Sequence, residues 1–461
     1  MPIFLDRGAG ALDTARKAYR TCRRNTRRGA QSPRSRILLR FPQAYSRGRA
    51  LDRAGLTEAS RGSRPISTLL ALGYVLAGVI ALAHAGDTLR APDEFEYLSI
   101  GQNVALHAMF SMDGQNLTAW RSPGMPAIIA VLWRIWPSVY LIKALSVGCW
   151  MATAYIIAKT AACLHSAAAG YVAATLYLLY IYQLYAATTL YPQTLAGLLV
   201  AASVAAVVLP ITLTPRRQAL LAAALTLQIL LIPNCIVVAA AVYPYALLRG
   251  RLGMRSVVAA GAIIMLVILS WCYRNQQAIG GFTFTTSMGV TLYAGNRDPV
   301  PDPIEGSSAG ISNVDEQANG LSEIENDKYF RRRSAEWMKA HPLKTIGISA
   351  EKFIHWFAYE NKYETSVEVP AISLLSLSMA FIYYPVLVGA SVVAIRSRRR
   401  NERDFAILSW IIYLLASLSY ALFLTRIRYR LPFDTLLFCV APGLLIDMAR
   451  KYFPTYTPEL A

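Results

Sequence analysis

Long apolar runs alternate with short polar or basic segments along most of the chain, beginning at residue 66. A membrane-spanning helix needs about 20 mostly apolar residues, and the first run, 66–85, has that length. Further runs follow at 139–162, 166–184, 193–210, 218–232, 235–249, 256–272, 371–395, 405–425 and 433–449. The pattern therefore predicts an all-α, polytopic membrane protein of about ten transmembrane helices over residues 66–450.

Two of these runs, 218–232 and 235–249, are short for a bilayer and are separated by Pro233 and Asn234. Lipid cannot satisfy the free backbone groups of a turn inside the membrane. If both runs cross the bilayer, we expect other parts of the protein to shield the turn between them.

Basic residues indicate how the spans are oriented. They concentrate in loops on the same side as the arginine-rich segment 1–65, at 216–217, 249–255, 396–403 and 450–451. Because cytoplasmic loops carry an excess of Lys and Arg, we expect an inner (plasma) membrane protein with both termini in the cytosol. Segment 1–65 is then a mostly disordered cytosolic tail, and 451–461 is a short one.

Two longer loops, 86–138 and 273–370, are expected on the external side. The first contains a predicted interfacial helix at about 93–110. A short apolar segment at about 125–136 follows, which is too brief to span. The second begins with an irregular stretch at 300–320. Two predicted surface helices follow it, at 324–340 and 343–359.

Composition and charge agree with a membrane protein. The chain has 461 residues, of which 55% are hydrophobic, and a formal net charge of +19. Because 16 of the 46 Lys and Arg precede residue 65 and most others lie in short loops, the charge reflects membrane topology and not nucleic-acid binding. The six cysteines show no Cys-x-x-Cys spacing, so neither a disulfide framework nor a zinc site is predicted.

The first external loop begins with three carboxylates within four residues, Asp93, Glu94 and Glu96. A carboxylate at the membrane surface can act as general base toward an acceptor hydroxyl, and neighbouring carboxylates raise its proton affinity. Two carboxylates could instead hold a divalent cation. The alternative without chemistry is an acidic turn that caps the following helix.

Arginines stand at the external ends of several apolar runs, against the usual positive-inside bias. They are Arg121, Arg274, Arg426, Arg428 and Arg430. The guanidinium fork binds phosphate oxygens in a bidentate way, so phosphate is the natural ligand. The alternative is contact with lipid headgroups.

Four short sequence motifs occur in the same order along this chain as in a known protein family. They are Pro92-Asp93-Glu94 with Tyr97; Trp120-Arg121-Ser122-Pro123-Gly124-Met125-Pro126; Trp271, Arg274-Asn275, Gly281-Phe282, Gly289, Leu292 and Gly295-Asn296; and Arg428-Tyr429-Arg430-Leu431-Pro432. In order and spacing over about 66–450, the chain resembles bacterial members of the GT-C superfamily. These integral-membrane glycosyltransferases use polyprenyl-phosphate sugars, and the resemblance is to the branch of the protein O-mannosyltransferases and the lipid A aminoarabinose transferase.

The resemblance implies a GT-C-like fold and a hexosyl- or pentosyltransferase. It moves a sugar from a polyprenyl-phosphate donor to an external glycan, lipid or protein acceptor, with inversion at the anomeric carbon. Asp93 is then the catalytic base, with Glu94 as its companion carboxylate, and the donor region is formed by the matching positions Tyr97, Arg121, Arg274, Asn296, Arg428, Tyr429 and Arg430.

The chain also departs from the family pattern. Gln193 follows Tyr191-Pro192 where the family often has an acidic residue, and Ile232-Pro233 replaces an expected Arg-Pro pair. A metal-assisted variant that needs a second carboxylate at the first of these turns is thereby put in doubt, and the need for a divalent metal stays open.

Two other classes of function fit the pattern less well. A transporter or flippase of a lipid-linked envelope intermediate would also use external arginines, but transporters place ionisable residues near the bilayer midplane. Lys143 is the main residue of that kind in these spans. A non-catalytic scaffold leaves the grouped acids and external arginines without a role.

Overall fold

A computed structural model describes residues 53–297, 318, 320–358 and 373–453. The chain divides into two compact units, Met1–Arg61 and Gly62–Ala461. Of the first unit only 53–61 are described, as the first turns of helix α2 (Arg53–Ala85). Residues 1–52 of the tail predicted to be disordered lie outside the described part, whereas residues 53–65 are the first turns of α2. Most of the predicted irregular stretch 300–320 and of the short tail 451–461 also lies outside it.

The described residues are helices joined by turns and loops, without a strand. The first half of the second unit contains α3 (Pro92–His107), α4 (Gly124–Ile135), α5 (Val139–Leu164), α6 (Ala167–Leu179), α7 (Ile181–Ala187), α8 (Gln193–Val208), α9 (Pro215–Leu231), η1 (Pro233–Cys235) and α10 (Ile236–Leu248). The second half contains α11 (Met254–Ile279), α12 (Ser287–Gly295), α13 (Glu323–Ala340), α14 (Pro342–His355), α15 (Leu374–Ser378), the π-helical turn η3 (Met379–Tyr383), α16 (Tyr384–Arg396), α17 (Arg400–Ala421), α18 (Ile427–Phe438) and α19 (Ala441–Tyr452).

Five helical segments in the described residues are long and apolar enough to cross a membrane: Pro65–Ala85, Val139–Leu164, Met254–Ile279, Leu374–Arg396 and Arg400–Ala421. Two bent pairs, α6 with α7 at 64° and α18 with α19 at 43°, raise the number to seven if each pair is one span. These are the helices of an α-helical membrane protein. The expected number of ten is not reached by length and composition, because α8, α9 and α10 are too short.

Burial separates peripheral from central spans. Only 11% of the apolar window of Pro65–Ala85 and 17% of that of α11 is buried inside the protein, against 61% for α17. The exposed leucines and isoleucines of the peripheral helices are those that a lipid environment would cover. The protein core therefore lies around α17 and its neighbours.

Helix α18 is the most enclosed element, since ten of its residues from Ile427 to Phe438 are buried. It packs against α8 and α17. Gly197 on α8 permits this close approach, because a Cβ there would lie 3.3 Å from Thr435 Cγ2 and 3.5 Å from Pro432 Cα. Small residues at such contacts let membrane helices approach closely, so the start of α18, which carries Arg428, is firmly positioned.

The turn between α9 and α10 is shielded, as the sequence predicts for these two short runs. Pro233 begins the single 3-10 turn η1, and the backbone N–H of Cys235 donates to the carbonyl of Ile232 at 2.9 Å. Cys235 is buried, and the side chain of Asn234 reaches Ser419 of α17 at 3.4 Å. The protein itself thus bonds the Cys235 N–H and the side-chain amide of Asn234.

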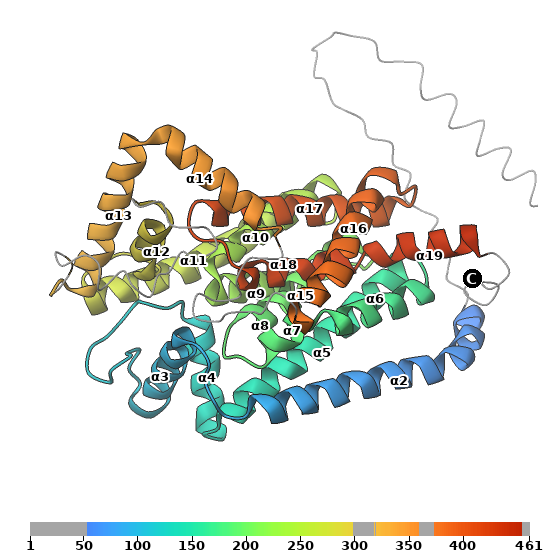
Figure 1. Ribbon diagram of the computed structural model, residues 1–461, viewed down its shortest axis with the longest axis horizontal. Helices are drawn as coiled ribbons and strands as arrows, with labels where there is room; N and C mark the ends of the chain where they lie inside the picture. Colours follow the sequence, from blue (N-terminus) through green and yellow to red (C-terminus); the bar gives the residue numbers. More distant parts are fainter. Residues whose placement is uncertain (1–52, 298–317, 319, 359–372, 454–461) are drawn as a thin grey trace, which may run out of the picture. The chain divides into compact units, whose positions relative to one another are not determined.

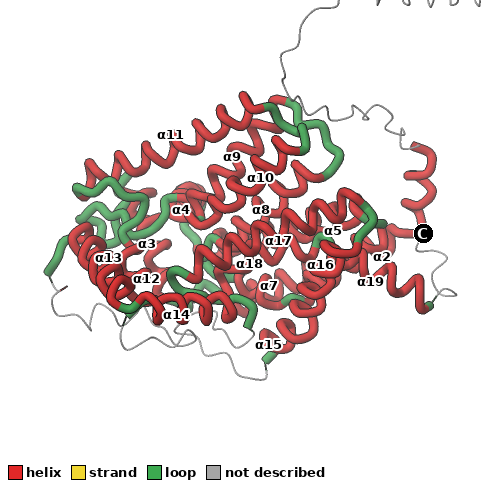
Figure 2. Tube along the Cα trace, turned by 90° about the horizontal axis from the view of Figure 1, so that it is seen from above, coloured by secondary structure: helices red, strands yellow, loops and turns green. Residues whose placement is uncertain are grey.

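Helices α3, α12 and α13 gather at one end of the bundle, whereas α19 lies toward the other end (Figures 1 and 2). Side-chain bonds tie the first of these ends together, since Glu323 at the start of α13 accepts from the Thr118 hydroxyl at 2.6 Å and the Ala119 N–H at 2.8 Å. The two loops predicted to be external therefore meet at the same end.

This arrangement leads to a topological prediction. A reporter fused after Arg400 should be cytosolic, and one inserted between residues 300 and 320 should be external, because Lys and Arg are retained on the cytosolic side. Paired alkaline phosphatase and green fluorescent protein fusions would measure this. The opposite result at either position would move the site described below to the other side of the membrane.

Candidate active site

The candidate site starts from the first turn of α3. Pro92 is at its first position, where a missing N–H has no cost, and Asp93 and Glu94 follow in the first turn. Carboxylates at a helix N-terminus are favoured by the helix dipole. No side chain caps this helix from Ala91, so the acidic residues supply the polar start, and their further contacts decide whether that is their whole role.

Asp93 lies between two arginines that are distant in sequence. Its Oδ1 is 2.6 Å from Arg121 Nη2, and its Oδ2 accepts from Arg428 Nη2 at 3.0 Å. Burial alone would raise the pKa of Asp93, but the two guanidinium groups outweigh it and hold the pKa below its usual value. Asp93 is therefore ionised at neutral pH, and the two arginines are brought to one point.

Arg121 is fixed from two further sides. Glu96 accepts a hydrogen bond from Arg121 Nε and another from Trp120 Nε1 at 3.0 Å. The buried ring of Tyr97 lies below the guanidinium, with 5.3 Å between the Arg121 carbon and the ring centroid. Such cation–π contact favours a planar, weakly hydrated guanidinium. Tyr97 and Arg121, both predicted site residues, are thus neighbours in the structure.

Arg428 lies among aromatic rings. Its guanidinium carbon is 4.6 Å from the centroid of Tyr191 and 5.1 Å from that of Tyr429, and Arg428 Nη2 donates to the Tyr429 hydroxyl at 3.3 Å. Tyr429 in turn stacks on Tyr420, with centroids 4.8 Å apart and planes 5° apart. The rings fix the plane of the guanidinium, which is what bidentate recognition of an anion requires.

A cavity of about 690 Å³ opens beside this cluster. Tyr97, Arg121 and Tyr429 line one part of it. Its other walls are mainly apolar side chains from α9, η1, α10, α11, the loop 280–286 and the start of α12, among them Ile229, Leu231, Ile232, Ile236, Ile268, Phe282, Phe284 and Met288. A largely apolar cavity with a cationic group at one side suits a ligand with an anionic head and a hydrocarbon body.

Glu94 faces away from this cluster. It is 1% exposed, and its two oxygens accept from the backbone N–H groups of Arg90 at 3.1 Å and Leu190 at 2.9 Å. These bonds tie the start of α3 to the segment just before α8. Each oxygen of Asp93 and Glu94 thus has its own donor, and the two carboxylates do not converge on one point.

Replacement of Glu94 should therefore act first on stability. In Glu94→Gln one carboxylate oxygen becomes an NH2 group, which cannot accept from the backbone N–H that it faces. A buried N–H without an acceptor lowers the free energy of unfolding by about 1–3 kcal/mol. We expect a lower midpoint in thermal unfolding of the purified protein, with residual activity that follows the folded fraction. Loss of activity at an unchanged unfolding midpoint, together with chelator sensitivity, would instead support a metal shared with Asp93.

Arg274 and Asn296 lie outside the lining of this cavity. Arg274 Nη1 donates to the Thr118 carbonyl at 2.7 Å, and its guanidinium lies over the rings of Phe110 and Trp271, so it holds the first external loop against α11. Asn296 is buried and donates to the carbonyls of its own turn and of Leu422, both at 2.9 Å. The structure gives both residues contacts that hold the external segments together.

Arg430 is buried in the protein core and is likewise absent from the cavity lining. It forms an ion pair with Asp434 at 3.4 Å and donates to the Trp356 carbonyl at 2.8 Å. Asp434 also accepts from the hydroxyls of Tyr180 and Tyr413, both at 2.8 Å. The structure thus brings Asp93, Tyr97, Arg121, Arg428 and Tyr429 together and leaves Arg430 apart.

Several cluster residues were not predicted as site residues. Tyr191 precedes the Pro192 that begins α8, and this Tyr-Pro pair at the external end of a run was its one sequence signal. Tyr420 lies in an apolar run with no distinguishing mark. Arg331 of α13 also lines the cavity and pairs with Asp327 at 2.8 Å. In the sequence, Arg331 is one of several charged residues in a predicted surface helix, and no signal distinguishes it from the others.

The remaining feature of the site is its set of possible metal ligands. In the part of the chain that is described, no group of three or more His, Cys, Asp or Glu side chains is arranged to hold a metal ion.

Searches of the chain against protein-family models and against curated protein sequences find no match.

Proposed function

We propose that this protein is a membrane glycosyltransferase of GT-C type, with about ten spans and cytosolic termini, in the inner membrane. It transfers a hexosyl or pentosyl group from a polyprenyl-phosphate donor to a glycan, lipid or protein acceptor on the external side. One observation carries the proposal: Asp93 lies between Arg121 and Arg428, and Arg121 lines a mainly apolar cavity. That set supplies a base, a phosphate site and room for a lipid chain.

The donor phosphate is expected to take the two guanidinium groups that Asp93 contacts in the structure. Once the arginines share their charge with the phosphate, they stabilise ionised Asp93 less, and its pKa rises. Asp93 is therefore a stronger base when the donor is bound than in the free protein. The arrangement thereby links deprotonation of the acceptor to donor binding.

The transfer step then balances in a simple way. Asp93 accepts the proton of the acceptor hydroxyl, whose oxygen forms a bond to the anomeric carbon while the bond from that carbon to the lipid phosphate breaks. The leaving phosphate retains the electron pair, and Arg121 and Arg428 stabilise its charge. Attack from the face opposite the phosphate inverts the anomeric centre.

The test uses a deletion strain as the source of acceptor. Its envelope should lack one modification that the parent has, by mass spectrometry of glycans, lipids and proteins. Purified protein, that envelope extract and synthetic polyprenyl-phosphate pentoses or hexoses should then yield the missing modification and free polyprenyl phosphate in equal amounts. Identical envelopes in the two strains, with no polyprenyl phosphate released, would contradict the proposal.

One observation favours the alternative, a transporter or flippase of a lipid-linked intermediate. The Arg430 and Asp434 pair is fully buried, and buried Lys143 donates to the carbonyls of Gly86 at 3.0 Å and Thr88 at 2.8 Å. Ionisable groups inside membrane domains often serve transport. In proteoliposomes a transporter would move the labelled donor across the bilayer intact, whereas a transferase would consume it.

A further inference from the structure

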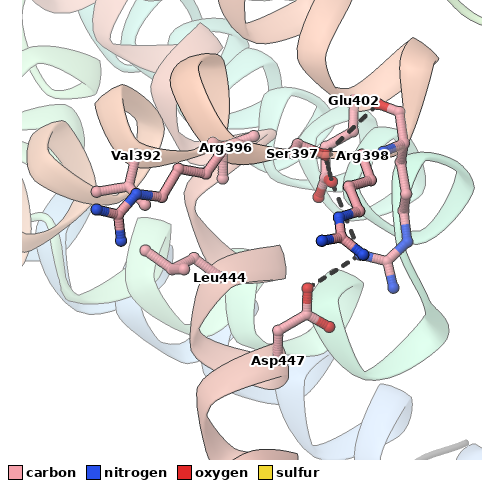
Figure 3. Close-up of a pocket in the computed structure, with 9 residues that line it drawn as sticks. Val392, Arg396, Ser397, Arg398, Glu402, Leu444 and Asp447 are labelled. Atoms are coloured by element: carbon pink, nitrogen blue, oxygen red, sulfur yellow. Dashed lines mark hydrogen bonds and ion pairs between the residues drawn. The ribbon is translucent and has the colours of Figure 1, made fainter.

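A second pocket lies where α16, α17 and α19 meet. It has a volume of about 470 Å³ and is lined by the loop between the candidate spans Leu374–Arg396 and Arg400–Ala421 and by α19 (Figure 3). Helix α19 lies toward the end of the bundle opposite α3 (Figures 1 and 2). The basic loop 396–403 places this pocket on the side expected to be cytosolic. It is thus separate from the candidate active site.

The acidic residues of this pocket are already engaged. Asp447 accepts from Arg399 Nη1 and lies beside His165 Nε2, both at 3.0 Å. Glu402 accepts from the Ser397 hydroxyl at 2.6 Å and lies 3.8 Å from Arg399 Nη1. These contacts fix the loop between α16 and α17 onto α19. They also use Arg399 as the counter-ion of both carboxylates.

Arg396 and Arg398 are the remaining charges of the lining. Both are exposed, and neither forms an ion pair with a carboxylate of the residues that the structure describes. Figure 3 shows the Arg396 guanidinium on the far side of Leu444 from Asp447. The pocket therefore presents two guanidinium groups that are free to bind an anion, and phosphate oxygens are their best-matched ligand.

The pocket also has an apolar part. Val392, Val393 and Leu444 line it beside the arginines. The nearby side chains of Ile395, Leu445 and Met448 are 80%, 42% and 47% exposed, as expected where a protein faces lipid. A free phosphate ion would use the arginines and leave this apolar wall without a ligand. A phospholipid uses both, with its phosphate at the guanidinium groups and its glycerol and upper acyl chain against the wall.

We propose that this pocket is a binding site for the headgroup of an anionic phospholipid of the cytosolic leaflet. Arg396 and Arg398 contact the anionic headgroup from different sides of the pocket, and Val392 and Leu444 contact the acyl chain. Basic pockets between membrane helices on the cytosolic side bind anionic headgroups by this combination of charge and shape. The site does not depend on the reaction proposed above.

The test measures lipid retained by the full-length purified protein. In native mass spectrometry, phosphatidylglycerol should be retained in preference to phosphatidylcholine. Arg396→Gln with Arg398→Gln should lower the apparent affinity for phosphatidylglycerol roughly tenfold or more, because each basic residue contributes on the order of 1 kcal/mol near an anionic headgroup. Equal retention of both lipids by the parent would overturn the proposal.

A matched double variant separates the pocket from bulk charge. Arg216→Gln with Arg255→Gln removes the same charge from exposed positions in other loops predicted to lie on that side. It should leave the retention of phosphatidylglycerol within about twofold of the parent. An equal loss in both double variants would show that surface charge alone causes the effect. Displacement of the lipid by inorganic phosphate at equal concentration would show that the arginines bind a soluble anion. Either result overturns the lipid site.

Discussion

Asp93→Asn should lower sugar transfer by at least roughly 10²-fold, the loss typical of a removed general base. The substitution keeps the size of the side chain and its ability to begin α3 but removes the proton acceptor between Arg121 and Arg428. The measurement is the initial rate of product formation with purified, membrane-inserted protein at saturating donor. This is the largest effect that the proposed mechanism predicts.

A control in the same external loop makes the result interpretable. Asp113 is exposed and accepts bonds only within its own turn, from Ser111, Gln115 and Asn116, so Asp113→Asn should leave transfer within about twofold of the parent. Near-normal transfer by Asp93→Asn at parental expression would remove Asp93 as the base and leave the acidic turn as a structural start of α3.

Asp93 also affects stability in acid. Because its pKa in the folded protein lies below the unfolded value of about 3.9, the ionised carboxylate stabilises the fold above that pH. This stabilisation disappears as pH falls through the lower folded pKa. The unfolding midpoints of parent and Asp93→Asn should therefore begin to converge below about pH 4 and coincide only below the folded pKa of Asp93. A difference that persists below that folded pKa would show that the substitution disturbs packing as well as charge.

Arg428→Lys should reduce turnover roughly 10- to 100-fold, although it keeps the positive charge, because charge-assisted bonds to a phosphate are lost. An ammonium cannot lie flat between Tyr191 and Tyr429 or present two parallel donors. Arg121→Lys should behave in the same way, because it also loses the bond to Glu96. The measurement is kcat and KM over a range of donor concentrations, since a phosphate site affects both.

The matched control is Arg134→Lys on α4. Arg134 is exposed, donates to the carbonyl of Ala105 at 2.8 Å and forms no ion pair with Asp93 or Glu96, so its replacement should change transfer less than twofold. Full activity in both Arg428→Lys and Arg121→Lys would show that these arginines contact lipid headgroups and do not bind the donor phosphate.

The helices were predicted from sequence more successfully than the spans. The expected helices at 93–110 and 324–340 correspond to α3 (Pro92–His107) and α13 (Glu323–Ala340), because capping residues and periodicity are local signals. Length and composition identify five spans, or seven with the pairs bent by 64° at Tyr180 and by 43°, so the expected ten stays a prediction. Helices α8, α9 and α10 are too short to be counted as spans by length alone.

For the site, the sequence indicated the residue types but not their directions. Successive residues of a helix differ by about 100°, so Asp93 and Glu94 point to different partners. Arg428 and Arg430 differ by about 200°, which directs the first to Asp93 and the second to Asp434 in the core. Only the packing of α18 decides which of the two arginines reaches the cluster.

The ion pairs at the site have a consequence for how a donor arrives. Arg121 and Arg428 carry two positive charges, and Asp93 and Glu96 carry two negative ones, so the cluster sums to zero before any ligand binds. A neutral cluster exerts little long-range attraction on an anionic lipid. Encounter with the proposed donor would then be set by lateral diffusion in the bilayer, and selection would begin only at contact, when the phosphate exchanges places with a carboxylate.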